Sequence, residues 1–256
     1  MVLTIDVGNT NIVLGGFEND ELIFVSRVQT NKNKMSDEYA IEFDGILRFY
    51  KCTPEMFDGA IISCVVPPLN HMLKKAISRL LNCKVMTVSP GTKTGLNIKI
   101  DNPAILGSDL VCGAVSAIGR YPLPCIIIDL GTATKFSVLD KDGNFLGVSI
   151  MPGVIISLEA LSASSAQLPH IDLRESVTLI GKNSPDSMRS GIIFGTASMI
   201  EGMVERINEE LGQKATVIAT GGVASNIIPY CKSEIIVDEN IVIYGLKEIY
   251  NKNTKK

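Results

Sequence analysis

The feature that most constrains the fold is a short turn sequence that occurs twice in the chain. Residues 5–11 read IDVGNTN, and residues 128–134 read IDLGTAT. Apolar residues precede and follow each copy, and an apolar run bounded by Gly and Asn is typical of a buried strand that enters a turn. Each copy therefore predicts a β-hairpin with a carboxylate at the tip of its first strand.

The residues of these turns suit the binding of a nucleotide phosphate. Gly8 and Gly131 allow the backbone to approach a ligand closely, and the turn amides with the Asn and Thr side chains offer donors to phosphate oxygens. The strand-tip aspartate is a hard oxygen ligand that can hold Mg²⁺. Ordinary hairpin turns share this composition, but two copies in matching apolar frames favour a functional role.

The order of predicted elements repeats as well. The first half predicts strands over 2–5, 12–17 and 22–30, then a helix over 36–50, a strand over 60–65, a helix over 69–81, a strand over 85–88 and a helix ending near 119. The second half predicts strands over 125–129, 135–139 and 145–150, helices over 153–162 and 184–211, strands over 216–220 and 235–237, and a last helix near 242–250. The repetition predicts a duplicated α/β fold, with domains at 1–118 and 119–256 and a cleft between them.

Composition excludes several classes of protein. The chain is 46% hydrophobic and 20% charged, and its net charge of -3 gives no general attraction to nucleic acid. No apolar run approaches the roughly 18 residues of a membrane span, and the N-terminus lacks the features of a signal peptide, so a cytoplasmic protein is expected. The six cysteines are scattered and the two histidines lie far apart, which argues against a zinc site or a disulfide framework.

Further motifs extend the likeness to one family. They are SCVVPP at 63–68, GLNIK at 95–99, DNP at 101–103, PG at 152–153, GKN at 181–183 and ATGG at 219–222. Together with the two turns, they follow the order found in type III pantothenate kinases across nearly the whole chain. The chain therefore resembles that family, which lies in the superfamily of actin, sugar kinases and heat-shock chaperones.

The resemblance implies a fold and an activity. The fold is a pair of ribonuclease H-like domains, as in actin-like ATPases. The activity is transfer of the γ-phosphoryl group of ATP to the 4′-hydroxyl of pantothenate, the first step toward coenzyme A. The family's cofactors are ATP with Mg²⁺ and a monovalent cation, K⁺ or NH₄⁺, and its members form homodimers.

Carried over by position, the resemblance also implies roles for individual residues. Asp109 is the expected general base, Asp6 the expected Mg²⁺ ligand through the phosphates, and Asp129 the expected ligand of the monovalent cation. The implied ATP contacts are Asp6, Val7, Gly8, Asn9, Thr10, Asn11, Thr132, Gly221 and Gly222. The implied substrate contacts are Ile100, Gly107, Ser108, Asp109, Leu110 and Ser184. For Asp109 a plain helix-capping role is the alternative.

Three positions depart from the family pattern. Leu110 stands where the family has an arginine, Ile100 where it usually has a tyrosine, and Lys135 where it often has a threonine. The Arg and Tyr belong to the pantothenate site in the family, whereas the residues implied for ATP are intact. Lys135 has two interpretations: it faces the acceptor or nucleotide, or it is a solvent-facing strand lysine.

The remaining alternatives are a kinase of a different small-molecule acceptor, a nucleotide-binding regulatory protein without turnover, and a phosphatase on the same fold. The chain has neither a GxxxxGK[ST] loop nor the HRD and DFG motifs, which excludes the other common designs for phosphoryl transfer. Phosphoryl transfer depends mostly on positioning and charge neutralisation, with one carboxylate to accept the hydroxyl proton. The three retained aspartates therefore favour an enzyme.

Overall fold

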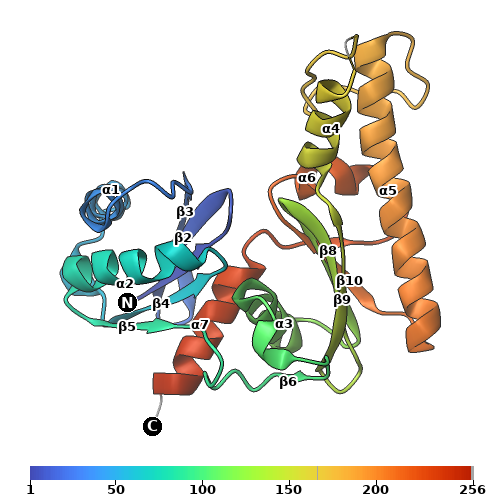
Figure 1. Cartoon of the computed structure of the whole chain (residues 1–256). Helices are drawn as coiled ribbons and strands as arrows, with labels where there is room; N and C mark the ends of the chain where they lie inside the picture. The colour runs from blue at the N-terminus through green and yellow to red at the C-terminus, as the bar shows by residue number, and fades with distance from the viewer. Residues whose placement is uncertain (166, 255–256) are drawn as a thin grey trace. The chain divides into compact units, whose positions relative to one another are not determined.

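The computed structural model describes residues 1–165 and 167–254, and the chain forms two compact units (Figure 1). The first unit contains residues 1–96 and 101–119 and the C-terminal residues from Asn240, and the second contains residues 97–100 and 120–239. The predicted division into 1–118 and 119–256 differs from this one by one residue at the boundary, Gly119, and at two further places. The chain crosses briefly into the second unit at 97–100, and it returns to the first unit at Asn240.

The first unit is built on a five-stranded sheet with the order β3-β2-β1-β4-β5. Its strands are β1 (Val2–Val7), β2 (Asn11–Glu18), β3 (Glu21–Gln29), β4 (Gly59–Cys64) and β5 (Lys84–Thr87). β1, β2 and β3 form an antiparallel meander, and β4 and β5 run parallel to β1. The helices are α1 (Ser36–Phe49), α2 (Pro67–Leu81), α3 (Ser108–Arg120) and α7 (Ile241–Thr254), with 3₁₀ turns at Pro54–Met56 and Pro103–Ile105.

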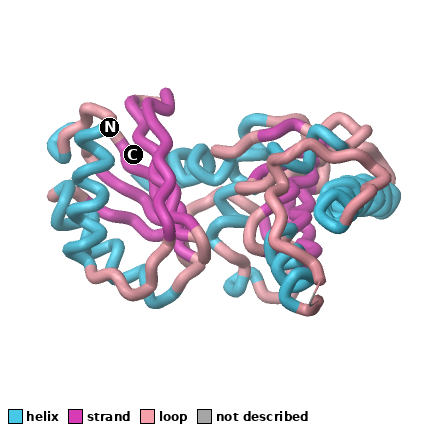
Figure 2. The backbone as a smooth tube through the Cα atoms, turned by 90° about the horizontal axis from the view of Figure 1, so that it is seen from above, coloured by secondary structure: helices cyan, strands magenta, loops and turns pink. Residues whose placement is uncertain are grey.

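Alternation along β1 decides which residues enter the core and which face the site. Leu3, Ile5 and Val7 are fully buried and pack in one cluster with apolar residues of α1 and α2. Successive side chains of a strand point to opposite faces, so Thr4 and Asp6 lie on the other face. α7 packs against that sheet, and Figures 1 and 2 place it on the side opposite α1 and α2.

Helix α7 belongs to the first unit because its buried side chains pack against the five-stranded sheet. Ile241, Ile243, Leu246 and Ile249 are all buried, and the helix packs against β1, β2 and β4. Gly245 allows a close approach to α3, since a β-carbon there would overlap the Cys112 carbonyl oxygen. A local pattern predicts this helix but does not show which sheet receives it.

The second unit repeats the strand connections of the first, on a six-stranded sheet with the order β11-β10-β7-β8-β9-β6. Its strands are β6 (Asn97–Ile98), β7 (Cys125–Leu130), β8 (Ala133–Leu139), β9 (Asn144–Pro152), β10 (Thr216–Thr220) and β11 (Ile236–Val237). β7, β8 and β9 are antiparallel, and β10 and β11 run parallel to β7. The duplicated α/β fold is thus confirmed, and the two-residue strand β6 is an addition that the sequence did not indicate.

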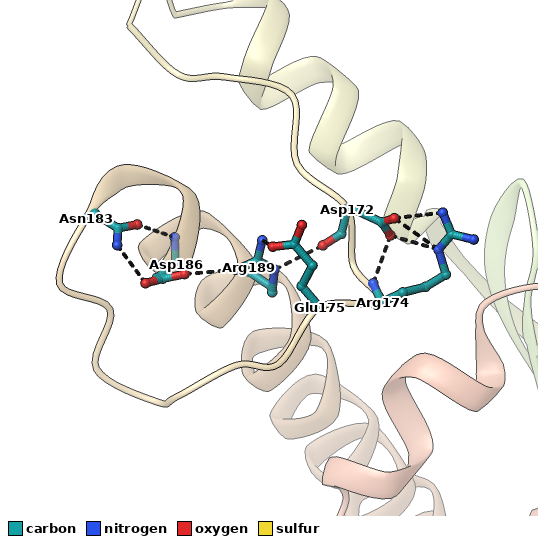
Figure 3. A network of polar contacts seen from close by, with 6 residues as sticks. All are labelled: Asp172, Arg174, Glu175, Asn183, Asp186 and Arg189. Carbon is teal, nitrogen blue, oxygen red and sulfur yellow. Dashed lines mark hydrogen bonds and ion pairs between the residues drawn. The ribbon is translucent and has the colours of Figure 1, made fainter.

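Helices α4 (Val154–Ala163), α5 (Ser184–Leu211) and α6 (Ala224–Ile227), with a 3₁₀ turn at Ile228–Tyr230, contribute to the apolar core on one face of this sheet. Asn183 caps α5, because its Oδ1 accepts a hydrogen bond from the Asp186 amide. Part of the segment before α5 is attached to this helix by the buried Arg189. Its guanidinium donates to the Asp172 carbonyl at 3.0 Å, to Asp186 Oδ1 at 2.9 Å and to Glu175 (Figure 3).

Within the described ranges, none of the helices combines the length and the apolar character needed to cross a membrane.

Candidate active site

The first turn joins β1 to β2 and presents donors outward. The Gly8 amide donates to the Asn11 carbonyl at 3.0 Å, which closes the turn. Thr30 holds it from β3, because its hydroxyl donates to the Gly8 carbonyl at 2.7 Å and its amide to the Thr10 carbonyl at 2.8 Å. Asn9, Thr10 and Asn11 are exposed. A fixed turn with exposed amide and hydroxyl groups is suited to phosphate oxygens.

Asp6 lies at the strand tip where the turn begins, as predicted. In the sheet it is paired with Val13 on β2 and with Ser63 on β4. The residue is partly buried, and its Oδ1 atom is buried. A half-buried carboxylate beside an exposed turn is positioned to interact with a cation that accompanies phosphate.

Asp109 lies in the first turn of α3, and Gly107 makes room for its carboxylate. Asp109 Oδ1 accepts a hydrogen bond from the Leu110 amide at 2.9 Å. A β-carbon at Gly107 would overlap that same oxygen, so no larger residue fits there without moving the acid. Packing against the Asp109 side chain therefore explains the glycine at this position.

The start of α3 is attached to the end of β4 through a pair of serines. The hydroxyl oxygens of Ser63 and Ser108 are 2.9 Å apart, and Ser108 Oγ accepts a hydrogen bond from the Cys64 amide at 3.1 Å. Since Ser63 is the sheet neighbour of Asp6, these contacts bring the beginning of α3 close to the tip of β1. Ser63 was not among the predicted site residues, although its place in the SCVVPP motif was noted.

The electrostatics of Cys112 show that the two acids share one environment. Burial raises the pKa of the Cys112 thiol well above its ordinary value, and the negative charges of Asp6 and then Asp109 raise it further. Both charges thus act on one buried thiol of α3, the helix whose first residue, Ser108, is hydrogen-bonded to the end of β4. The fold thus gathers Asp6 and Asp109, which are about a hundred residues apart in the sequence, around one end of the first sheet.

The second turn joins β7 to β8, and two glycines pack directly against it. A β-carbon at Gly153 would overlap the carbonyl oxygens of Gly131 and Thr132, and one at Gly221 would overlap the backbone of Leu130. Gly221 also has φ of +97°, a conformation that favours glycine. Gly153 therefore lies against the exposed Thr132, and the predicted nucleotide residue Gly221 lies against Leu130, where the turn begins. Gly153 was not predicted as a site residue.

Asp129, at the tip of β7, is engaged by a lysine from the neighbouring strand. It is paired with Lys135 on β8 and Thr220 on β10. The Lys135 Nζ atom lies 3.0 Å from Asp129 Oδ2, and the side chains are 20% and 26% exposed. Lys135 is thus not a solvent-facing strand lysine. It forms an ion pair with Asp129, the acid that opens the second turn.

The predicted substrate residues fall into two groups. Gly107, Ser108, Asp109 and Leu110 are consecutive at the start of α3 in the first unit. Ile100 follows β6 in the second unit and is half-buried, and Ser184 is the exposed first residue of α5. Leu110 is half-buried and brings no charge to the group around Asp109.

Comparisons with known proteins show which family the chain resembles. The family model described as Type III pantothenate kinase matches residues 2–206. A Brevibacillus brevis protein named Type III pantothenate kinase is 41% identical over 253 residues, which cover 99% of each chain. A Geobacillus protein of the same name is 41% identical and covers 100% of this chain and 99% of its own.

A solved structure also shares the fold. A Campylobacter jejuni protein described as a Baf family transcriptional activator aligns with a TM-score of 0.63 at 18% identity, covering 99% of this chain and 100% of its own. At that identity the likeness concerns the fold alone. The family model, in contrast, includes both turns and all three aspartates. The chain belongs to the type III pantothenate kinase family.

Proposed function

We propose that this chain phosphorylates pantothenate with ATP to give 4′-phosphopantothenate and ADP, the first step of coenzyme A biosynthesis. Family membership over the whole chain supports the reaction. One observation supports the roles given to the residues below. Asp6 and Asp109 lie around one end of the first sheet, beside a turn with exposed hydrogen-bond donors.

In this proposal Asp109 is the general base. Its carboxylate accepts the proton of the 4′-hydroxyl while the hydroxyl oxygen forms a bond to the γ-phosphorus. The bond from the γ-phosphorus to the bridging oxygen breaks, and ADP leaves with that electron pair. Because such a transfer needs little covalent help from the protein, positioning and charge neutralisation supply most of the rate.

The residues around Asp6 fit Mg²⁺ that arrives with ATP. Asp6 offers a carboxylate, and the turn over residues 8–11 offers donors for the phosphates. Among the described residues no three acids, histidines or cysteines group as metal ligands, so phosphate oxygens would complete the coordination of the ion. Bound Mg²⁺ would neutralise charge on the β- and γ-phosphates. Thr132, Gly221 and Gly222 are the proposed contacts of the nucleotide in the second unit.

The residues around Asp129 do not fit a bound K⁺ or NH₄⁺ ion. Such an ion needs oxygen ligands, but Lys135 already places an ammonium 3.0 Å from the Asp129 carboxylate. A second cation at that oxygen would be repelled by the first. We therefore assign no step to a monovalent cation in this chain.

A homodimer is also proposed. The resemblance implies one, and α4 exposes Ile155, Ile156 and Leu161 on a helix that is apolar on most of its faces. Exposed apolar patches often mark contact surfaces. Light scattering on the purified protein would give twice the mass of the chain, and a monomer at micromolar concentration would contradict the proposal. The cytoplasmic location stays a prediction.

The test of the base is Asp109→Asn, with product followed by mass spectrometry. We expect turnover to fall by about 10²–10⁴-fold, which is the usual contribution of a positioned proton acceptor, while ATP affinity changes little. Asp37→Asn is the matched control, because Asp37 is an exposed acid in the first turn of α1 in the same unit. Its turnover should equal that of the wild type.

Other outcomes would favour the rival functions. If Asp109→Asn kept near-normal turnover, Asp109 would be only a helix cap, since Asn is itself a good cap. If the wild type phosphorylated a neutral polyol but not pantothenate, the chain would be a kinase of a different acceptor. If it bound ATP and phosphorylated nothing, the regulatory alternative would hold.

A further inference from the structure

The hairpin of β7 and β8 fixes a lysine against the acid at the tip of the second turn. The antiparallel register pairs Asp129 with Lys135 directly, and opposite residues in such a pair have β-carbons about 4.5–5.5 Å apart. A lysine is long enough to reach across that spacing and fold back on the carboxylate. The separation of 3.0 Å between Lys135 Nζ and Asp129 Oδ2 is that of a direct ion pair.

The surroundings of the pair limit the freedom of the ammonium. The Lys135 side chain is 20% exposed and the Asp129 side chain 26%, so water reaches both groups only partly. Phe136, the next residue along β8, is fully buried in the core of the unit and anchors the strand. The Lys135 ammonium is therefore held at the turn by the chain, whereas a free cation would have to bind there from solution.

We propose that Lys135 supplies, as part of the chain, the positive charge that a free monovalent cation would otherwise supply at Asp129. This inference rests on the proposed kinase function. The ε-ammonium group is an alkylated NH₄⁺, with the same charge, three remaining N–H donors and a similar distance to oxygen. Its tether gives it a permanently high local concentration, whereas a free ion must be bound from solution. The chain consequently works without K⁺ or NH₄⁺.

The first test is a salt panel on the wild-type protein, which needs no variant to fold. Turnover of ATP and pantothenate is measured in KCl, NH₄Cl, NaCl and choline chloride at equal ionic strength. We expect the four rates to agree within about twofold, since general screening is the same in each. Activation by K⁺ and NH₄⁺ over Na⁺ and choline would overturn the proposal.

The second test is Lys135→Thr, which removes the ammonium and leaves Asp129 accessible to an ion. We expect its turnover in choline chloride to fall roughly tenfold to a hundredfold, the usual effect of losing a charged hydrogen bond. K⁺ or NH₄⁺ should then restore most of the rate. Lys141→Thr is the matched control, because Lys141 is exposed in the turn between β8 and β9, and it should stay insensitive to the choice of cation.

The third test does not depend on catalysis. The thermal midpoint of unfolding is measured as KCl replaces choline chloride at constant ionic strength. A ligand that binds only the folded state raises the midpoint in a saturable way. We expect such a rise for Lys135→Thr and none for the wild type or Lys141→Thr.

The thermal readout separates the two proposals. If no pantothenate is phosphorylated, the proposed function fails, but a K⁺-dependent midpoint seen only in Lys135→Thr still supports the tethered ammonium. A saturable rise in the wild type, or no response of Lys135→Thr in either rate or midpoint, would show that the pair is only a structural ion pair.

Discussion

The two copies of the turn sequence differ by one residue in the length of the loop, and that difference changes which side chain faces each aspartate. In the first copy Val7 pairs with Ile12 across residues 8–11, so Asp6 lies opposite Val13. In the second copy Leu130 pairs with Thr134 across residues 131–133, so Asp129 lies opposite Lys135. Because side chains alternate, one extra residue in the loop reverses the face of every residue after it.

The consequence is that the two acids have different neighbours. By motif position Ile12 corresponds to Lys135, yet Ile12 is fully buried in the core with α1 and α2. The residue opposite Asp6 in the antiparallel pair is the uncharged Val13. Asp129 has its charge balanced by the chain itself. Two acids in matching frames can thus take different tasks.

The largest expected effect separates the two acids. Asp6→Asn should lower turnover by about 10²–10³-fold, because it removes charge stabilisation next to the transferring group. Asp129→Asn should cost less, since the Lys135 ammonium remains at the second turn. Steady-state rates at saturating ATP and Mg²⁺ test the comparison. Equal losses in the two variants would mean that the two turns do the same work, and near-normal turnover of Asp6→Asn would remove Asp6 from the metal site.

The next effect concerns binding of the acceptor. The carboxylate of pantothenate is suited to the fork of an arginine, but Leu110 and Ile100 stand where the family has Arg and Tyr. We expect Leu110→Arg combined with Ile100→Tyr to lower the Michaelis constant for pantothenate by roughly tenfold, as one charged hydrogen bond would.

The single variants show how much each of the two positions contributes to acceptor binding. The Michaelis constant for ATP is the internal control and should not change. An unchanged constant for pantothenate in the double variant would mean that other residues already hold the carboxylate.

The smallest effect is one of stability and tests the glycine beside the second turn. Gly221→Ala should lower the free energy of unfolding by about 1–3 kcal/mol, because it forces a β-carbon into the Leu130 backbone at positive φ. Gly222→Ala is the matched control, since its β-carbon would meet open space. In the first unit the corresponding end of β4 carries Cys64, not glycine, so the need for a glycine is specific to the second turn. Urea denaturation gives the free energy of unfolding of both variants. Equal values for Gly221→Ala and Gly222→Ala would contradict the prediction.

Much of the fold could be predicted because it depends on local pattern. The β-meander of each unit, the helices at 36–49 and 184–211, and the duplication itself follow from runs of apolar residues and turn residues. The strand tips of Asp6 and Asp129 were likewise predicted from the turns. β6 was missed because a two-residue strand leaves almost no pattern.

The sequence by itself determined the repeated turns, the order of the strands and the likeness to one family of kinases. Only the tertiary structure decided that α7 returns to the first sheet, that Ser63 and Ser108 bring Asp109 near Asp6, and that Lys135 faces Asp129. The physical reason is that these outcomes depend on pairing register and long-range packing. A residue's own neighbours in the sequence fix its strand, but the length of a loop and the sheet that accepts a buried face decide what its side chain meets.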